Sequence, residues 1–499
     1  MTLLDKLAPL RAHAGRRRTS GLDDATVLRF AARDPDLAAA IEAAPAEYAR
    51  IRAEFADLLD LDEDAQMRAV QADFVNFYAD DNVNPYVALV ARGPWIVTLK
   101  GAVIHDSGGY GMLGFGHTPA PVLEAMARPQ AMANVMTPNL AQLRLTRALR
   151  REIGHSRGGC PYAAFLCLNS GSESVSLAGR IADVNTRLNI EAGGRHAGRA
   201  VKRIAIKGAF HGRTELPAQY SDSTRPTYAK YLASFMRREG ELITIEPYDI
   251  DQLRRAFAEA DTQGYTIEAM FLEPVMGEGD PGRSVPPEFY AAARELTREH
   301  GTLLLVDSIQ AGLRAQGVLS IVDYPGFEGL EAPDMETYSK ALNAGQYPLS
   351  VLAVNERAAS LYRKGVYGNT MTANPRAMDV AAAVLSQLTP ELRANIRERG
   401  REAIERLEAL KNESGGLITK VQGTGLLFSC ELAPVFKCYG AGSIEEWLRE
   451  RGIGVIHGGV NSLRFTPHFA ITSEELELVV GMVGRALREG PRLEQAAAA

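Results

Sequence analysis

Lys340 and Asp307 are the two residues whose types and spacing point most directly to chemistry. The chain has ten lysines among its 55 basic residues, so a lysine between an apparent strand and a glycine-containing turn stands out. A lysine amine can form a Schiff base with an aldehyde and can afterwards carry protons. Asp307 ends the apolar run 303–306, where a carboxylate is costly unless a group such as a protonated ring nitrogen pairs with it. Taken singly, a salt-bridging lysine and a helix-capping aspartate are alternative readings.

The stretch Gly171-Ser172-Glu173 has the composition of an anion site. It lies between an apolar run and a helical pattern, where glycine lets the backbone approach a phosphate and Ser172 can cap the helix and donate its hydroxyl. The N-terminus of a helix also offers free amide donors and a positive partial charge. Gly-Ser before a helix is most often only a cap, so this motif gains weight from the residues around it.

One aromatic and two arginine side chains complete the candidate site. Phe210 follows another apolar run and can stack on an aromatic ring, while Arg213 can bind a carboxylate through two parallel hydrogen bonds. Arg464 offers a second guanidinium, and two arginines in one cleft suit a substrate with two carboxylates. Singly, each arginine is better explained as a surface ion pair. Together, the lysine, the aspartate, the phosphate site and the stacking ring fit pyridoxal 5'-phosphate as the cofactor.

The elements that carry these residues alternate between strand and helix from about residue 160. Four apolar runs each stop at polar residues or glycine and precede a helical stretch: 165–168, 204–206, 270–272 and 303–306. Such runs are typical of buried parallel strands, whose carboxyl ends gather ligands in open α/β sheets. The sequence therefore predicts an α/β fold with a large, mostly parallel sheet, and it predicts that the polar residues after the strands converge on one crevice.

The chain, at 499 residues, is too long for one ordinary domain. Residues 1–80 are predicted to form a helical N-terminal extension, 81–372 an N-terminal segment with the large cofactor-binding domain, and 373–490 a smaller α/β C-terminal domain. A long helical region is expected after Asn374-Pro375, through Leu410, followed by alternating strand residues and a final αβα stretch.

Two helical patterns mark the extension, which we interpret as a packing appendage rather than a regulatory domain. Asp34-Pro35 has the form of an N-cap followed by proline at the first helical position. The second pattern is an apolar stripe on a helix ending near Asp80, formed by Met67, Val70, Phe74 and Phe77. The run 16–18 of three arginines is interpreted as a solvated tail segment.

Composition excludes several classes of function. A net charge of −6 provides no basic surplus for nucleic acid, so small molecules are the expected partners. The four cysteines have neither the spacing of a zinc site nor that of a disulfide framework, which suits a reducing compartment. Apolar runs fall far short of a bilayer span. We expect a soluble cytoplasmic protein that binds no metal and no membrane.

The ordered motifs resemble those of the class III aminotransferases, the ornithine, GABA and ω-amino acid group of pyridoxal phosphate enzymes. The resemblance covers roughly residues 85 to 485 and is carried by the following positions: Gly116-His117, Asn169 to Glu173, Phe210 to Thr214, Glu273 to Gly279, Asp307 to Gln310, Ser339-Lys340, Thr370, Asn374-Pro375 and Gly423 to Leu426. It implies an aspartate aminotransferase-like fold with a large sheet domain and a smaller C-terminal domain.

The resemblance also implies a role for each matching residue. These roles are Lys340 as the Schiff base lysine, Asp307 at the pyridine nitrogen, Phe210 stacked on the ring, Ile309 beneath it, Gln310 near the ring hydroxyl, and Gly171 and Ser172 at the phosphate. Thr370 is expected to reach the phosphate of a neighbouring subunit's cofactor, which implies a homodimer with shared active sites. Glu273 and Arg464 match a glutamate–arginine pair that opens for 2-oxoglutarate, and with Arg213 they favour an ω-amino donor.

Some positions depart from the family's pattern. Ser308 stands where a glutamate is common, Met276 and Gln422 replace frequent Gln and Arg, and Ala315-Gln316 interrupts an Arg-Thr-Gly motif. None of these changes removes a core catalytic group, so they bear on the donor substrate more than on the chemistry.

The leading functional hypothesis is a ping-pong transaminase in which Lys340 holds the cofactor and relays the proton. An epimerase, an aminomutase or a decarboxylase would use the same parts, because related folds host all of these reactions. A catalytically inert cofactor-binding protein that acts through its extension is the third hypothesis, and the retention of both Lys340 and Asp307 argues against it.

Overall fold

The structure is a computed structural model that describes residues 2–132, 135–236, 238 and 240–493. It divides into two compact units, and each is described by itself. The first unit comprises Met1–Ala120, Glu398–Gln422 and Leu426–Ala499, and the second comprises Pro121–Arg397 and Gly423–Gly425. The extension therefore belongs to the same unit as the C-terminal residues, while the domain boundaries expected at 80 and 372 stay a prediction.

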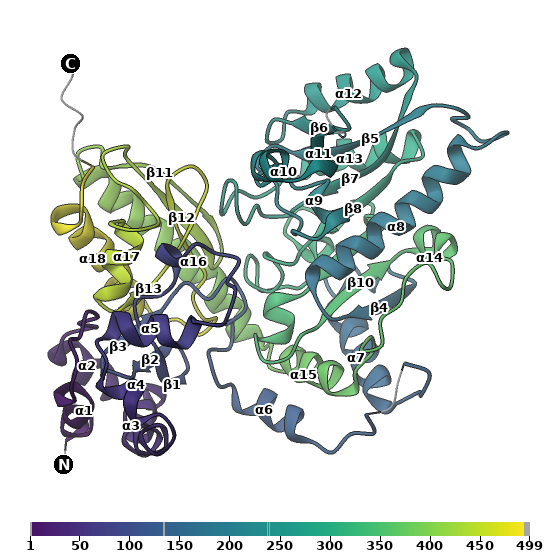
Figure 1. Ribbon diagram of the computed structural model, residues 1–499. Coiled ribbons are helices and arrows are strands. Elements are labelled where there is room, and N and C mark those ends of the chain that lie inside the picture. The colour runs from purple at the N-terminus through teal and green to yellow at the C-terminus, as the bar shows by residue number, and fades with distance from the viewer. Residues whose placement is uncertain (1, 133–134, 237, 239, 494–499) are drawn as a thin grey trace. The chain divides into compact units, whose positions relative to one another are not determined.

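A seven-stranded mixed sheet forms the centre of the second unit (Figure 1). Its strands, in spatial order, are β4 (Ala164–Leu168), β10 (Ser350–Val354), β9 (Met335–Tyr338), β8 (Leu303–Asp307), β7 (Tyr265–Leu272), β5 (Ala200–Ile206) and β6 (Leu242–Ile245). Strand β10 runs antiparallel to both of its neighbours, and the five strands from β9 to β6 pair in parallel. The expected large, mostly parallel sheet is confirmed.

The four predicted apolar runs all lie in strands of this sheet. Strand β7 is buried along its whole length, as a strand with both faces covered should be. Helix α8 (Gly171–Ile190) packs across the five strands from β4 to β7 in the sheet order. Its apolar stripe of Val175, Ala178 and Ile181 is fully buried. The periodicity read from the sequence thus corresponds to the buried face of this helix.

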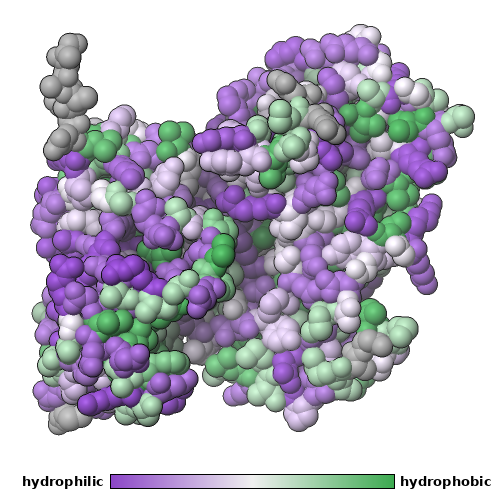
Figure 2. Space-filling view, in the orientation of Figure 1, coloured by the Kyte–Doolittle hydropathy of each residue, from purple (hydrophilic) through white to green (hydrophobic). Residues whose placement is uncertain are grey.

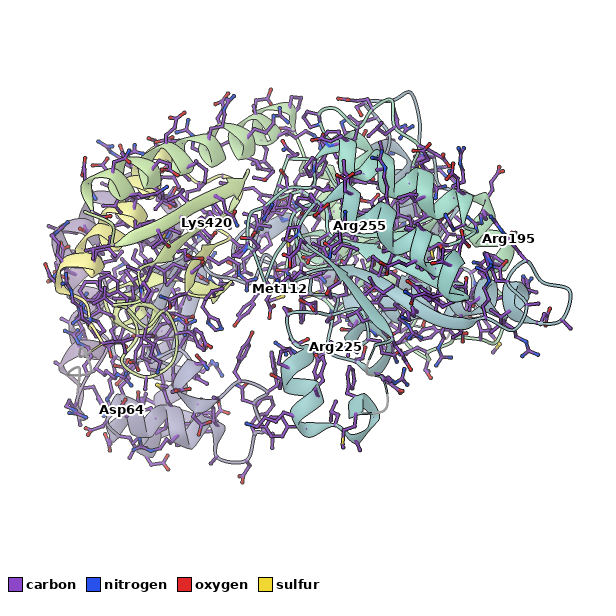
Figure 3. The ribbon with its side chains drawn as sticks, turned by 90° about the horizontal axis from the view of Figure 1, so that it is seen from above. Asp64, Met112, Arg195, Arg225, Arg255 and Lys420 are labelled. Atoms are coloured by element: carbon purple, nitrogen blue, oxygen red, sulfur yellow. The ribbon has the colours of Figure 1, made fainter. Side chains whose placement is uncertain are left out.

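The remaining helices of the second unit connect or cover the strands. They are α6 (Ala120–Ala127), α7 (Leu140–Glu152), α9 (Glu215–Ala218), α10 (Arg225–Tyr231), α11 (Ala233–Met236), α12 (Ile250–Gln263), α13 (Pro287–Glu299), α14 (Glu356–Leu361) and α15 (Pro375–Ser386), with 3₁₀ turns η2 (Ile321–Asp323) and η3 (Lys340–Asn343). Charged side chains reach the outside of the unit, as Arg195 does in Figure 3.

The first unit contains two four-stranded sheets. One has the order β1 (Ala88–Arg92), β2 (Trp95–Thr98), β3 (Val103–Asp106) and β13 (Ile453–Gly454), and the other β11 (Ile418–Thr424), β12 (Leu427–Leu432), β15 (Ser462–Phe465) and β14 (Ile456–Gly458). Its helices are α1 (Leu3–Ala12), α2 (Asp24–Ala31), α3 (Pro35–Glu54), α4 (Ala56–Asp60), α5 (Glu63–Gln71), α17 (Ile444–Glu450) and α18 (Ser473–Glu489), with the turn η1 (Asp80–Asn82). Strand β13 pairs in parallel with β3, so the chain's C-terminal part completes a sheet begun near residue 88.

The helical region expected between Asn374 and Leu410 is interrupted. Asn374 caps α15 (Pro375–Ser386), and α16 (Pro390–Glu413) begins after a break at residues 387–389. Pro390 explains the break, because the residue before a proline is disfavoured in the helical conformation and proline itself suits a first helical turn. Helix α16 crosses from one unit into the other.

In the extension one prediction is confirmed and another is wrong. Asp34 caps α3 with Pro35 at its first position, as predicted. The apolar stripe does not continue to Asp80, because α5 ends at Gln71 and Phe74 and Phe77 are 71% and 75% exposed. Residues 72–79 are exposed except for the partly buried Asn76 and Tyr78, so little burial offsets their modest helix propensity. On the face seen in Figure 2, hydrophobic groups are scattered over a mostly hydrophilic surface.

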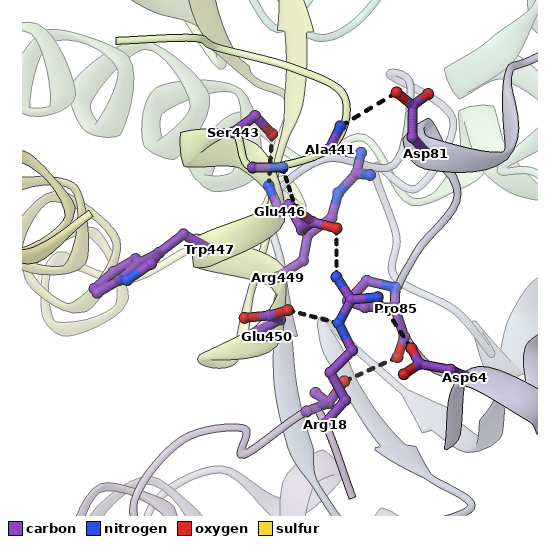
Figure 4. Close-up of polar contacts among 12 residues, drawn as sticks. Arg18, Asp64, Asp81, Pro85, Ala441, Ser443, Glu446, Trp447, Arg449 and Glu450 are labelled. Carbon is purple, nitrogen blue, oxygen red and sulfur yellow. Dashed lines mark hydrogen bonds and ion pairs between the residues drawn. The ribbon is translucent and has the colours of Figure 1, made fainter. Parts of the chain in front are cut away.

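Arg18 corrects the interpretation of the arginine run as a solvated tail. Its guanidinium donates to Asp64 at 3.1 Å, to Glu450 at 2.7 Å and to Glu446 (Figure 4). These ion pairs join the start of the chain to α5 and α17 and raise the pKa of Arg18 against the lowering effect of burial. Arg18 thus ties the extension to the C-terminal part of the first unit.

Among the described helices, none combines the length and the apolar character that a bilayer crossing requires.

Candidate active site

Asp307 and Lys340 follow two adjacent parallel strands at the same edge of the sheet. Strand β8 ends at Asp307, which pairs in register with Thr337 of β9, and the backbone N–H of Ser308 donates to the carbonyl of Thr337 at 3.0 Å. Strand β9 stops at Tyr338, and η3 begins with Lys340. The predicted arrangement is therefore present, with Asp307 at the carboxyl end of one strand and Lys340 just past that of its neighbour.

Lys340 has an unusual backbone conformation. Its φ of 42° lies in the left-handed region, which residues with a side chain seldom occupy because the Cβ atom is crowded there. Its side chain is half-buried. Strained conformations of this kind persist where the surrounding structure enforces them, and they are common at functional sites.

The Asp307 carboxylate is buried and held by two donors. Its residue is 3% exposed. Its Oδ2 atom lies 2.9 Å from Nδ1 of His211, and the backbone N–H of Ile309 donates to Oδ1 at 3.1 Å. A carboxylate has about four acceptor sites, so two donors leave capacity on this one for a further cationic or N–H partner.

Glu273 holds the turns around the site. Its two carboxylate oxygens accept the backbone N–H groups of Phe210 at 3.0 Å and of Gly277 at 2.9 Å. The residue is 2% exposed, and burial raises the pKa of its carboxyl to about 7. The Glu273 carboxylate is thus engaged by the backbone of its own unit.

The N-terminus of α8 has the expected place but a different cap. Ser170, not Ser172, is the N-cap, and its hydroxyl accepts the N–H of Glu173. The reason is that α8 starts at Gly171, two residues earlier than a cap at Ser172 would place it. Within the described residues the amides of Gly171 and Ser172 have no hydrogen-bond acceptor, so both can donate to an anion.

Three glycines let the side chains of the site pack directly against the backbone. A Cβ on Gly171 would lie 2.7 Å from Cδ1 of Ile309, and one on Gly212 would lie 2.5 Å from Oγ of Ser172. A Cβ on Gly277 would lie 2.2 Å from Cδ of Gln310. Larger residues would push these side chains out of position. The close approach of Gly171 to Ile309, the free amides and the under-occupied Asp307 fit pyridoxal phosphate.

Arg213 is paired with a glutamate that sequence reasoning missed. The Arg213 guanidinium lies 3.7 Å from Glu278 and 5.3 Å from the centre of the Phe210 ring. Both charged side chains are partly exposed. Glu278 belongs to the same Glu-Pro-Val-Met-Gly-Glu run as Glu273, and that run was the signal that could have identified it.

Two further expected site residues have surroundings of their own, one in each unit. Thr370 is exposed, and its neighbour Asn369 donates to Glu173 at 2.8 Å, which ties the loop to the first turn of α8. Arg464 belongs to the first unit, where it is 3% exposed and its guanidinium lies 5.9 Å from the centre of the Tyr110 ring.

His211 is the other residue that the sequence did not single out. It stands inside the Phe-His-Gly-Arg motif, where Phe210 and Arg213 attracted the functional reading. Its bond to Asp307 joins residues 96 positions apart, and that contact has no local sequence signal.

Comparison with known proteins gives a consistent result. The family model described as Aminotransferase class-III matches residues 77–487. The chain is 30% identical over 313 residues to the acetylornithine aminotransferase of Xanthomonas campestris pv. campestris. The matched region covers 62% of this chain and 71% of that protein. It is 31% identical over 321 residues to ornithine aminotransferase 2 of Staphylococcus aureus, covering 63% and 73% of the two chains.

Solved structures share the fold. The ornithine aminotransferase from Toxoplasma gondii superposes with a TM-score of 0.72 at 24% identity, covering 88% of this chain and 98% of that one. A transaminase from the marine bacterium Virgibacillus gives a TM-score of 0.70 at 18% identity, covering 85% and 98%.

Proposed function

The chain belongs to the class III aminotransferases, and from this premise we propose the donor and the acceptor of its reaction. It is a pyridoxal 5'-phosphate enzyme that moves an amino group from an amino donor to a 2-oxo acid. We propose that the donor carries a terminal amine of the ornithine or N-acetylornithine type and that the acceptor is 2-oxoglutarate. The names of the curated relatives at 30% and 31% identity support this donor class.

The observation that carries the site assignment is the pair of residues at one sheet edge. Asp307 at the end of β8 retains acceptor capacity, and Lys340 follows the next strand in a strained conformation. The bound cofactor would supply an electron sink that makes the C–H beside the reacting amine acidic. In our proposal Lys340 is the covalent anchor and the base that carries the proton, and Asp307 holds the pyridine nitrogen protonated.

The other expected residues position the cofactor. We assign Phe210 and Ile309 to the two faces of the ring, Gln310 to its hydroxyl group, and the amides of Gly171 and Ser172 to the phosphate. These assignments are supported by the uncommitted amides at the α8 N-terminus and by the tight fit of Gly171 against Ile309. Thr370 would complete the phosphate site of a partner subunit in a homodimer, and its exposure in the single chain is compatible with that role.

Substrate carboxylates would be bound by the arginines. We propose that Glu278 partners Arg213 in the resting enzyme and gives way when a dicarboxylate enters, because this ion pair is long at 3.7 Å and partly exposed. Arg464 would supply the second guanidinium. Glu273, which the resemblance suggested for the pairing role, would instead shape the site through its bonds to Phe210 and Gly277.

We propose a cytoplasmic location, which the cysteine usage supports. All four cysteines are free thiols, and burial raises the pKa of Cys167 and Cys430 to about 12. Thiols in this state are unreactive and serve as packing groups.

A donor screen tests the proposed reaction. The purified protein is loaded with pyridoxal phosphate and incubated with 2-oxoglutarate and ornithine, N-acetylornithine, lysine, GABA or a β-amino acid, and the glutamate formed is measured. Ornithine-type donors should yield glutamate in proportion to donor consumed, and Lys340→Ala should yield none. Consumption of a donor without glutamate formation would overturn the transfer of nitrogen to 2-oxoglutarate and favour an epimerase or aminomutase outcome.

A further inference from the structure

His211 is locked in place beside Asp307. Its backbone N–H donates to Oγ of Ser221 at 2.9 Å, and the Ser221 hydroxyl is in turn within 3.0 Å of the carbonyls of Gly212 and Pro217. The His211 side chain has no exposed surface. The ring therefore has little freedom to leave Asp307, whose Oδ2 atom lies 2.9 Å from Nδ1.

The two nitrogens of the His211 ring have different surroundings. Nδ1 faces a carboxylate oxygen, which accepts, so Nδ1 carries a proton. Nε2 is buried and has no hydrogen-bond partner among the described residues, and the ring packs edge-on against Phe271 at 5.7 Å. A proton on Nε2 would leave a buried N–H of a charged ring unsatisfied, which costs more than a bare lone pair. These contacts favour a neutral ring with its proton on Nδ1.

The charge state of His211 decides what Asp307 can do. The acidic groups that face the ring are Asp307 and Glu273, and Glu273 is close enough to interact electrostatically with both. An imidazolium would neutralise Asp307 and weaken its attraction for a second cation. A neutral imidazole donates one hydrogen bond but leaves the negative charge uncompensated.

We propose that His211 is a positioning residue whose neutral, Nδ1-protonated ring fixes the plane of the Asp307 carboxylate and leaves its charge for the protonated ring nitrogen of the cofactor. This inference rests on the proposed role of Asp307 at that nitrogen. Two donors from different elements, the His211 ring on Oδ2 and the Ile309 backbone on Oδ1, hold the two oxygens. The remaining acceptor positions then point in one fixed direction.

Replacement variants separate this role from simple packing. His211→Asn retains an N–H donor near the position of Nδ1, while His211→Phe retains bulk without a donor. His196→Phe is the matched control, since His196 is 7% exposed and its ring bonds the backbone carbonyl of His300 at 3.0 Å. The affinity of each apo-protein for pyridoxal phosphate and the pH dependence of the bound cofactor's visible absorbance are measured, with thermal unfolding to verify folding.

We expect cofactor binding to weaken in the variant that lacks a hydrogen-bond donor at position 211. His211→Phe should bind the cofactor roughly tenfold or more weakly and shift the pH profile of its absorbance, because a hydrogen bond to a charged group is lost. His211→Asn should recover most of both properties, and His196→Phe should match the parent. A folded His211→Phe protein with parental affinity and pH profile would overturn the inference.

Two further measurements keep the test decisive. Nitrogen-15 NMR of histidine-labelled wild-type apo-protein should show a neutral ring protonated on Nδ1 for His211 around pH 7, and an imidazolium signal would overturn the inference without any variant. Asp307→Asn separates a failure of the proposed cofactor site from a failure of the proposed role of His211. If it leaves cofactor affinity unchanged, the proposed site itself fails; if it lowers affinity while His211→Phe does not, only the role of His211 fails.

Discussion

Two buried carboxylates, one in each unit, pair with histidine and differ in how completely they are satisfied. Glu475 in the first unit accepts from His105 at 3.0 Å, from His468 at 2.9 Å, and from the backbone and hydroxyl of Thr472 at 2.7 and 2.8 Å. Among the described residues, Asp307 in the second unit accepts from His211 and one backbone N–H alone. Both residues are 3% exposed. Burial is equal, so the difference lies in the number of donors.

The number of hydrogen-bond donors on each carboxylate indicates which of the two clusters is structural. The Glu475 cluster joins β3 to the capping box of α18, and Ser107 satisfies the other nitrogen of His105 at 3.1 Å. Burial would raise the pKa of Glu475, but its histidine partners hold it well below the ordinary value. One potential metal-ligand atom from each of His105, His468 and Glu475 lies within 4.8 Å of the other two. The Glu475 carboxylate already accepts four hydrogen bonds. We therefore interpret this cluster of three residues as a structural contact between β3 and α18 rather than as a metal centre.

Replacing Asp307 should produce the largest loss of function and little loss of stability. In Asp307→Asn the negative charge is gone while the shape remains, so the cofactor nitrogen loses its ionic partner and turnover should fall by roughly 10²- to 10⁴-fold. The free energy of unfolding of the apo-protein should stay level or rise, because a buried charge has been removed. Steady-state kinetics and urea unfolding measure the two effects, and a collapse of stability with retained turnover would invert the comparison.

Replacing Glu475 should do the reverse. Glu475→Ala leaves two histidines and a helix N-terminus without their acceptor, and the free energy of unfolding should fall by about 3–5 kcal/mol. Glu475→Gln keeps an acceptor oxygen and should lose less. Turnover per folded molecule, measured well below the unfolding temperature, should remain near the parental value. A stable Glu475→Ala protein with impaired turnover would assign the cluster to function.

The pH dependence of stability should have opposite signs at two buried glutamates. The folded pKa of Glu273 is about 7 against 4.5 for the free group, so its contribution is fully present below pH 4.5 and is lost as the pH rises through 7. The loss integrates to about 3 kcal/mol. The folded pKa of Glu475 is depressed, so its contribution is present above pH 4.5 and is lost as the pH falls below that value.

Urea unfolding between about pH 3 and pH 8 checks both signs. The parent should lose about 3 kcal/mol more than Glu273→Gln between pH 4.5 and 8, and it should lose more than Glu475→Gln on the acid side. Curves for the parent and Glu273→Gln that remain parallel from pH 4.5 to 8 would contradict the raised pKa of Glu273.

The sequence was most informative where chemistry coincides with the end of an element. Asp307 and Gly171 each follow an apolar run that stops abruptly, and this local signal located the sheet edge and the anion site. The partners of these residues carry no such signal. His211 reaches Asp307 from 96 positions away. Glu278 lies beside Arg213, and Glu273, which the resemblance paired with Arg464, accepts backbone N–H groups instead.

The errors in the extension have the same origin. Periodicity predicts which residues share a helix face, but it does not predict that anything covers the face, and Phe74 and Phe77 are exposed beyond the end of α5. Charge composition suggested that Arg18 is solvated, whereas its three carboxylate partners come from residues 64, 446 and 450. In both cases tertiary contacts, absent or present, decide the outcome.

Arg18 should show the smallest effect, because its ion pairs are partly exposed. Its side chain is 32% exposed, and a network at such a site contributes about 1 kcal/mol, less at high salt. Arg18→Ala should therefore lower the free energy of unfolding of the first unit slightly and should hasten proteolytic cleavage near the start of the chain. Arg17→Ala is the matched control, since Arg17 is exposed and has no ion pair within the described residues. Equal proteolysis of both variants and the parent would show that the ion pairs of Arg18 do not hold the extension in place. The contrast between structural and ligand-binding clusters would then rest on Glu475 and Asp307 alone.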